Sequence, residues 1–465
     1  MKRGFLKAIS FGSMGLLMLV LIGATLLEKI FGSSFALNNI YHSPWFIALW
    51  SLLVVSAMAY ILRTSRRYTL ILLHASFAFI LLGALVSFLT SQHGNILLAK
   101  DAVPASMFTT NENTLEKLPF NLQVTDIDTV YSKEDRLTID YKAHIVANKR
   151  KENHPHTISL NTPATIDGYS FCIKGVDDGN LSLLVARDTY GLPISYTGYL
   201  MVFVSFVMLL LDRESGFRRI LRLLQGEKNR KKRTDNVHHI TFAGRMGSIL
   251  PILLIILLFF LWLNSDTFPA TNGAESLFML AIAIILLAIV LKKRYTHLFK
   301  ALIITASITA FVAICSFERN SEVAPILRTP LLGVHVTTII IAYALLACTA
   351  INAVIALFGK NRGNTESSAL LGRLLLYPAT MLLATGIFIG AVWANVSWGR
   401  YWGWDPKEVW ALITLLACSL AFHTRSLPFM AKPKFFHIYC IAVFIIMLFT
   451  YLGVNYLLGG IHSYA

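Results

Sequence analysis

Residues 332–358 read LGVHVTTIIIAYALLACTAINAVIALF. This stretch contains no Asp, Glu, Lys or Arg, and its one histidine is His335. A helix of about 20 apolar residues crosses the ~30 Å hydrocarbon core of a membrane. We therefore expect residues 332–358 to form a transmembrane helix, and we expect the rest of the chain to be organised around a lipid bilayer.

The whole chain shares this apolar character. Of its 465 residues, 55% are hydrophobic and 14% are charged, and its mean hydropathy is +0.62. An ordinary soluble domain is about 25% charged, so this composition excludes a soluble enzyme and a disordered protein. We predict eleven membrane helices, with approximate limits 5–27, 45–62, 68–89, 197–211, 246–264, 276–291, 300–317, 332–358, 374–393, 409–423 and 435–457.

Lysine and arginine give these helices a direction. With the N-terminus inside, the inner segments hold 26 of the 41 Lys and Arg residues, and the short outer loops hold 5. Because short cytoplasmic loops are enriched in Lys and Arg, we expect the N-terminus inside and the C-terminus outside. The net charge of +16 is then mostly a matter of topology. The basic run at 228–233 also fits a nucleic-acid patch, but we expect it to lie on anionic membrane lipid and expect no nucleic acid partner.

One long polar segment, about residues 90–195, interrupts the apolar runs. Apolar and polar residues alternate within it, which predicts a half-buried strand at Leu137, Ile139, Tyr141, Ala143 and Ile145. The expected fold is an all-α polytopic membrane protein of about eleven transmembrane helices. A small β-rich extracytoplasmic domain is inserted between helices 3 and 4.

The cysteines carry no recognisable redox or metal pattern. There are five, four of them lie in apolar runs, and no C-x-x-C occurs. This spacing predicts no disulfide framework, no thiolate zinc site and no thioredoxin-like motif.

The most informative loop, WGRYWGWDPKEVW, covers residues 398–410 on the outer side. Indoles favour the membrane interface, so an aromatic belt is one interpretation of its four tryptophans. Asp405-Pro406 is a helix-start signal, and Trp398, Trp402, Asp405 and Glu408 would share a face if the loop were helical. Two glycines, Gly399 and Gly403, leave room for a flat ligand. Indole faces together with Arg400 and Lys407 suit a flat aromatic ligand with an anionic edge, such as a porphyrin.

Four of the 13 histidines form two layers. His74 lies about 9 Å into its helix from the inside at 1.5 Å per residue, and His423 ends a helix that begins outside, so both are expected at the inner depth. His335 and His462 lie on the outer side with the tryptophan loop. Each histidine alone fits a satisfied core or solvated residue. As pairs they are candidate bis-imidazole sites for haem iron.

The loop resembles the tryptophan-rich "WWD" signature of haem-handling membrane proteins in cytochrome c biogenesis. Residues 332–465 look like the ResC (CcsA-type) component, and residues 1–220 look more weakly like its ResB (CcsB-type) partner. The whole resembles a fused System II cytochrome c synthase. The expected parts are a ResB-like part at 1–220, a basic cytoplasmic linker at 221–245 and a ResC-like part at 246–465, with the WWD loop at 394–410.

The resemblance implies a haem lyase that moves haem b outward and joins its vinyl groups to the C-x-x-C-H cysteines of an apocytochrome c. It assigns His335 and His462 as external iron ligands and His74 and His423 as ligands within the membrane. It also places Trp398, Gly399, Trp402, Trp404, Asp405 and Trp410 in the haem motif. It implies a thioredoxin-like thiol reductant as partner and a bacterial cytoplasmic membrane as location. Two alternatives are a haem transporter or chaperone that serves a separate ligase, and a redox-active dihaem cytochrome.

Overall fold

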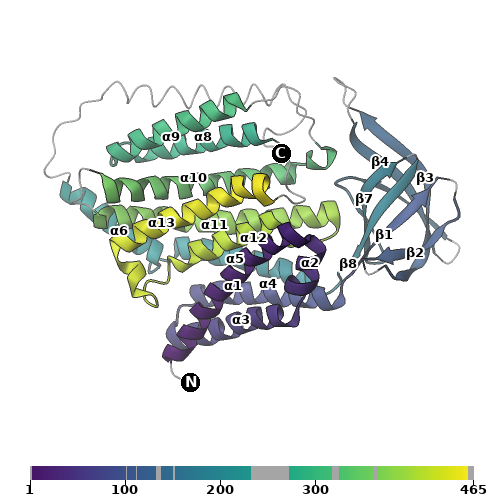
Figure 1. Ribbon diagram of the computed structural model, residues 1–465, viewed down its shortest axis with the longest axis horizontal. Helices are drawn as coiled ribbons and strands as arrows, with labels where there is room; N and C mark the ends of the chain where they lie inside the picture. The colour runs from purple at the N-terminus through teal and green to yellow at the C-terminus, as the bar shows by residue number, and fades with distance from the viewer. Residues whose placement is uncertain are drawn as a thin grey trace.

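The computed structural model describes residues 3–231 (without 101, 112, 132–137, 150–151 and 178), 272–316, 324–359 and 365–458. Figure 1 shows a helical body with a β domain at one end. The predicted span 246–264 and His462 lie outside the described residues.

Apolar helices form the body. Their bounds are α1 Arg3–Phe31, α2 Ser33–Ala36, η1 Leu37–Tyr41 (a π-helical turn), α3 Pro44–Thr64, α4 Tyr68–Thr90, α5 Gly191–Leu211, α6 Gly216–Lys231, α8 Gly273–Leu291, α9 Thr296–Cys315, η2 Pro325–Leu327, α10 Pro330–Phe358, α11 Thr365–Trp398, α12 Pro406–Leu420, η4 Pro428–Ala431, α13 Pro433–Leu448 and η5 Phe449–Leu458. Within the described ranges, nine helical segments are long and apolar enough to cross a membrane, and nine of the predicted runs fall on them.

The predicted run 409–423 is the exception. It forms the 15-residue helix α12, which starts three residues earlier than hydropathy indicated because Pro406 and its cap define the first turn. At its start the Trp410 indole Nε1 donates to Thr25 Oγ1 of α1 over 3.2 Å, and beyond its end the His423 ring lies 5.3 Å from that of Phe11. Thr25 and Phe11 are about 21 Å apart along α1, so α12 runs along most of the bundle.

The β domain is one antiparallel eight-stranded sheet. Its strands are β1 Gln92–Ala99, β2 Ala105–Thr110, β3 Leu115–Tyr131, β4 Thr138–Lys149, β5 Glu152–Ser159, β6 Ala164–Ile166, β7 Tyr169–Asp177 and β8 Asn180–Arg187. Their order is β5-β4-β3-β2-β1-β8-β7-β6. The outermost strands, β5 and β6, are consecutive in the chain and joined by a short loop with a Ser159–Thr162 bridge, so the sheet curls on itself.

The predicted alternation within this domain is confirmed on β4 at Ala143 and Ile145, whereas Ile139 and Tyr141 are half-buried and Leu137 lies outside the described residues. Ala143 and Ile145 are buried in the domain's core, together with apolar residues of β3, β7 and β8. Since alternate side chains of a strand point to opposite faces, the curled sheet fills its own interior and exposes polar residues outside.

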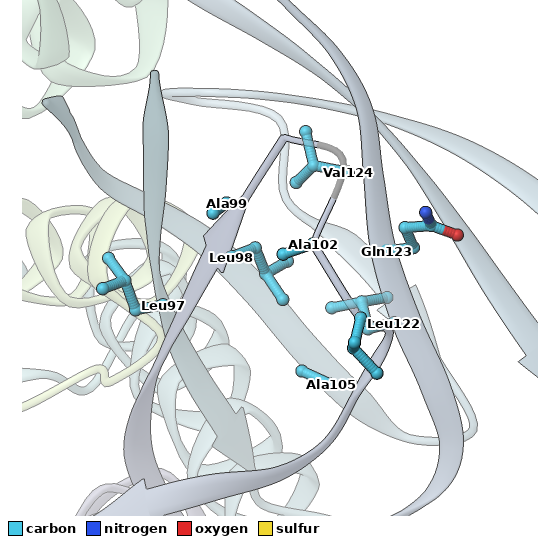
Figure 2. A pocket seen from close by; sticks show the side chains of 9 residues that line it. Leu97, Leu98, Ala99, Ala102, Ala105, Leu122, Gln123 and Val124 are labelled. Atoms are coloured by element: carbon cyan, nitrogen blue, oxygen red, sulfur yellow. The ribbon is translucent and has the colours of Figure 1, made fainter. Parts of the chain in front are cut away.

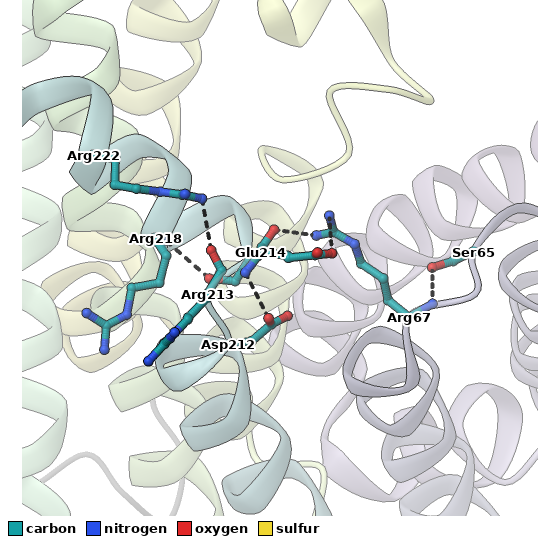
Figure 3. A network of polar contacts seen from close by, with 8 residues as sticks. Ser65, Arg67, Asp212, Arg213, Glu214, Arg218 and Arg222 are labelled. Atoms are coloured by element: carbon teal, nitrogen blue, oxygen red, sulfur yellow. Dashed lines mark hydrogen bonds and ion pairs between the residues drawn. The ribbon is translucent and has the colours of Figure 1, made fainter. Parts of the chain in front are cut away.

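Basic residues gather at the end of the body opposite the β domain. Arg67, just before α4, donates to the Glu214 carbonyl over 2.7 Å, and its guanidinium lies 3.9 Å from the Glu214 carboxylate (Figure 3). Arg218 Nε donates to the Leu210 carbonyl near the end of α5 over 2.8 Å. Arg218 thus satisfies a carbonyl that the end of α5 leaves open, and Arg67 binds the segment between α5 and α6. The N-terminal end of α1 also lies away from the β domain (Figure 1).

Candidate functional site

Within the tryptophan loop (398–410), residues 399–405 join α11 to α12 and are not helical, whereas Trp398 ends α11 and Trp410 lies in α12. Gly399 (φ 71°) ends α11 in the left-handed region, and Trp404 (φ 57°) adopts it too. Left-handed residues interrupt a right-handed helix. The predicted helical face shared by Trp398, Trp402, Asp405 and Glu408 is therefore wrong.

The predicted helix start at Asp405-Pro406 is confirmed. Asp405 Oδ2 accepts from the Lys407 backbone N–H over 3.0 Å, and Glu408 Oε2 accepts from the backbone N–H groups of Gly403 (2.9 Å) and Asp405 (3.2 Å). This is a capping box. Both carboxylates hold the loop against the first turn of α12.

The tryptophans lie in different aromatic surroundings. Trp404 stacks on Tyr41 of η1 with ring centroids 4.6 Å apart, and Trp402 lies at right angles to Trp404 at 5.8 Å. Trp398 meets Trp393 of α11 at 4.8 Å. The stacking partner of Trp404 comes from the first part of the chain, so the loop is built jointly by both parts.

The two loop glycines accommodate protein groups. A Cβ on Gly399 would lie 2.8 Å from the Cβ of Ala186 on β8, and a Cβ on Gly403 would lie 3.3 Å from Arg400 Cζ. The expectation that these glycines make room for a flat ligand therefore does not hold at Gly399, because β8 fills that space.

The two predicted cationic partners differ in environment. Arg400 is exposed, and its guanidinium packs over Gly403. Lys407 Nζ donates to Asn455 Oδ1 of η5 over 2.9 Å. Lys407 thus links the start of α12 to the last described helix, and Arg400 lies exposed against the loop at Gly403.

His335 lies one turn into α10, on the side of the tryptophan loop. Its Nδ1 is 2.7 Å from the Gly386 carbonyl of α11, and its ring packs on Gly390. Because a carbonyl oxygen only accepts, Nδ1 carries the proton and Nε2 carries the lone pair. A backbone hydrogen bond on one nitrogen that fixes the other as ligand is usual for metal-binding histidines.

The end of η5 reaches the same level. Tyr343 of α10 meets Tyr451 of η5 at 5.9 Å, and the two elements run in opposite directions. His335 lies eight residues back along α10, and Leu458 lies seven residues onward along η5. Leu458 and Trp404 both pack against the buried cluster that contains Tyr41 and Val454. His462, the predicted second outer ligand, lies outside the described residues.

The structure brings the two inner histidines together. The rings of His74, on α4, and His423, just after α12, have centroids 6.2 Å apart at 88°. Nδ1 of His74 is 2.8 Å from the Leu70 carbonyl, and Nδ1 of His423 is 2.9 Å from the Ser419 carbonyl. Each Nε2 again holds the lone pair. Two imidazoles on opposite sides of one metal ion, with bonds near 2.0 Å, have centroids roughly 6 Å apart, so the spacing fits bis-histidine ligation.

Sequence inspection missed a buried polar chain around Tyr401. The phenol lies 3.0 Å from Ser87 Oγ of α4 and 3.1 Å from Ser195 Oγ of α5, and Ser87 Oγ donates to the Asp188 carboxylate. Burial raises the pKa of the Tyr401 phenol, so it is protonated at neutral pH. The available signal was Ser87 within the predicted run 68–89 and Ser195 just before the predicted run 197–211.

A cavity in the β domain is too small for a porphyrin. It has a volume of about 140 Å³ and lies between β1, the following turn and β3 (Figure 2). Ligand pockets usually measure roughly 300–1,000 Å³. Its lining is mostly apolar, including Leu98, Leu122 and Val124, so it adds no ligand for iron.

Two family models match the chain. The ResB-like family model matches residues 63–191, and the cytochrome C assembly protein model matches residues 270–462. Similar proteins include the cytochrome c biogenesis protein CcsA of Chlamydomonas reinhardtii, which is 32% identical over 255 residues, or 49% of this chain and 70% of the relative. The CcsA of Guillardia theta is 29% identical over 50% of this chain and 88% of its own. The CcsA of Prochlorococcus marinus strain MIT 9301 is 32% identical over 48% and 85%.

Proposed function

Because this chain belongs to the fused ResB–CcsA family of System II cytochrome c biogenesis proteins, we propose that it is a complete holocytochrome c synthase. It moves haem b to the outer face of the membrane and attaches it to apocytochrome c. The observation that carries this proposal is the inner histidine pair. His74 comes from the ResB-like part and His423 from the CcsA-like part, so neither part alone supplies both ligands.

The reaction adds each substrate thiol across a haem vinyl group. A carbon–sulfur bond forms, the thiol proton ends on the neighbouring vinyl carbon, and the carbon–carbon double bond becomes single. No electrons are gained or lost overall. The substrate cysteines are the nucleophiles, so the task of this chain is to position the haem.

We assign the outer site to His335 and His462 as iron ligands, with Trp398, Trp402 and Trp404 fixing the ring plane. The four residues after Leu458 reach at most about 14 Å, and Leu458 and Trp404 pack against the same buried cluster, which supports this assignment. The histidine of the substrate's C-x-x-C-H motif then replaces one ligand and brings its cysteines beside the vinyl groups.

Other loop residues have supporting roles in this proposal. Arg400, exposed beside the loop, meets a haem propionate. Lys407 is assigned to the second propionate, and its bond to Asn455 places it beside η5. Trp410 anchors α12 on Thr25, and Asp405 holds the loop through its cap. The inner pair His74 and His423 holds haem on its way outward.

The protein is a multi-pass membrane protein. We assign it to a bacterial cytoplasmic membrane, with the N-terminus inside and the β domain, the loop and the C-terminus outside. The basic cluster at the end opposite the β domain supports this orientation. Because the sequence has no C-x-x-C, a thioredoxin-like partner is assigned the task of keeping substrate thiols reduced. We propose that the chain consists of a ResB-like part at 1–220, a cytoplasmic linker at 221–245 and a CcsA-like part at 246–465.

Co-expression tests the proposal. The full chain is expressed with an apocytochrome c in cells that lack other cytochrome c biogenesis machinery, and covalent haem is detected on denaturing gels by haem staining. We expect product from the wild type and at least a tenfold loss in His335→Ala. His297→Ala, an exposed histidine on α9, is the control and keeps its activity. Haem-loaded protein without covalent product would instead favour a transporter that serves a separate ligase.

A further inference from the structure

The hydroxyl chain around Tyr401 has a single consistent direction. Ser87 Oγ donates its one hydrogen to the Asp188 carboxylate, so it can only accept from Tyr401 Oη. Ser195 Oγ in turn donates to Tyr401 Oη. The other Asp188 oxygen accepts the Gly191 backbone N–H over 2.9 Å. The hydroxyls of Ser87 and Tyr401 each donate once and accept once, so the buried phenol is fully partnered.

Tight helix packing sets the positions of both serines. α4 and α5 approach so closely that a Cβ on Gly83 would collide with Ser195, and a Cβ on Gly191 would collide with Ser87. Small residues at a helix contact allow this approach in membranes. Ser87, Ser195 and Asp188 therefore form a rigid receptor for one phenol.

The β domain holds the tip of α11 beside this receptor. Cys172 Sγ of β7 donates to the Val396 carbonyl over 3.5 Å, and Ser397 Oγ donates to Asn161 Oδ1 over 3.0 Å. Gly399 packs on Ala186 of β8. Asp188 directly follows β8. The segment that contacts Gly399 through Ala186 therefore also supplies the carboxylate that accepts from Ser87.

We propose that the ResB-like part positions the tryptophan loop through this hydroxyl chain, with Tyr401 as the positioning residue for the outer haem site. Tyr401 lies between Arg400 and Trp402, and it is only 8% exposed. Its anchoring fixes the backbone from which Trp402 and Trp404 project. This inference rests on the proposed function for the identity of the ligand, and it assigns to the ResB-like part the task of shaping the CcsA-like haem loop.

The test uses Tyr401→Phe in the full chain, purified after haem-replete expression. Haem is measured in two backgrounds: His74→Ala, which retains the outer site, and His335→Ala, which retains the inner pair. We expect Tyr401→Phe to lower bound haem at least fivefold in the first background and to leave it unchanged in the second. Tyr439→Phe is the matched control and lowers neither; it removes a phenol on α13 that donates to the Ala417 carbonyl of α12.

A second set of variants separates positioning from general instability. Ser87→Ala breaks the same chain, so Ser87→Ala/Tyr401→Phe should lose no more outer-site haem than Tyr401→Phe alone. Thermal unfolding should match that of Tyr439→Phe. Equal haem loss in both backgrounds, losses that multiply in the double variant, or unchanged outer-site haem would overturn the inference. Failure of the wild type to make covalent cytochrome would contradict the proposed function. The amounts of bound haem in the two backgrounds test the role of Tyr401 independently of that result.

Discussion

Replacing Gly399 by alanine should release the tryptophan loop from the β domain. Gly399 has φ 71°, a left-handed conformation that costs an alanine about 1–2 kcal/mol. The new Cβ would lie 2.8 Å from Ala186 Cβ, and such overpacking costs about 1–3 kcal/mol. Together these costs are about 2–5 kcal/mol, which lowers the ratio of docked to undocked protein by roughly 30- to 5,000-fold.

Cys172 reports this docking. It is buried beside the tip of α11, and burial raises the pKa of its thiol to about 11, so it reacts slowly with maleimide while the domain is docked. We expect labelling at least tenfold faster in Gly399→Ala, measured in a Cys315→Ser background that removes an exposed thiol.

Two variants control this measurement. Gly175→Ala, on the same strand as Cys172, adds a Cβ that meets nothing within 4 Å, and it should leave the labelling rate unchanged. Ala186→Gly combined with Gly399→Ala removes the collision and should recover part of the protection. If Cys172 is labelled at the same rate in Gly399→Ala as in Gly175→Ala, the contact of Gly399 with Ala186 does not hold the loop against the β domain.

His74→Ala should lower the haem that co-purifies with the chain severalfold, and added imidazole should restore part of it, whereas His297→Ala should bind normally; absorption spectroscopy measures both. Asp405→Asn should keep nearly full activity in the co-expression assay, because asparagine also caps helices. Asp405→Ala should instead destabilise the start of α12 by about 0.5–2 kcal/mol, measured by thermal unfolding. Loss of activity in Asp405→Asn would point to a proton-transfer role for the carboxylate. Burial lowers the pKa of His93 in the folded protein. The unfolded chain therefore binds the proton first, so this contribution to stability is present above pH about 6.5 and is lost as the pH falls toward the folded pKa; thermal scans of His93→Gln should show a weaker loss on acidification than the wild type.

Much of the fold follows from local signals. In the part of the chain that the structure describes, apolar runs predicted nine helices correctly, because a membrane helix must satisfy its backbone internally and expose apolar side chains to lipid. Asp405-Pro406 predicted the start of α12, since an acidic cap followed by a first-turn proline is a signal of two adjacent residues. Counting residues from each helix end placed His74 and His423 at one depth, where their rings meet.

Long-range contacts were beyond such reasoning. No local sequence signal predicts the left-handed backbone of Trp404, because tryptophan has no preference for positive φ. In that conformation its ring stacks on Tyr41, which comes from a distant segment of the chain. The receptor for Tyr401 combines α4, α5 and the segment before α5, which only tertiary packing brings together. Contact between Gly399 and Ala186 joins positions more than 200 residues apart.

If this chain carries haem at two histidine sites, the absorption spectrum of the full-length protein, purified from haem-replete cells, will show it. We expect a Soret band and visible bands of low-spin iron with two imidazole ligands, with part of the signal lost in His74→Ala and another part in His335→Ala. A colourless protein, or a spectrum that neither substitution changes, would contradict it.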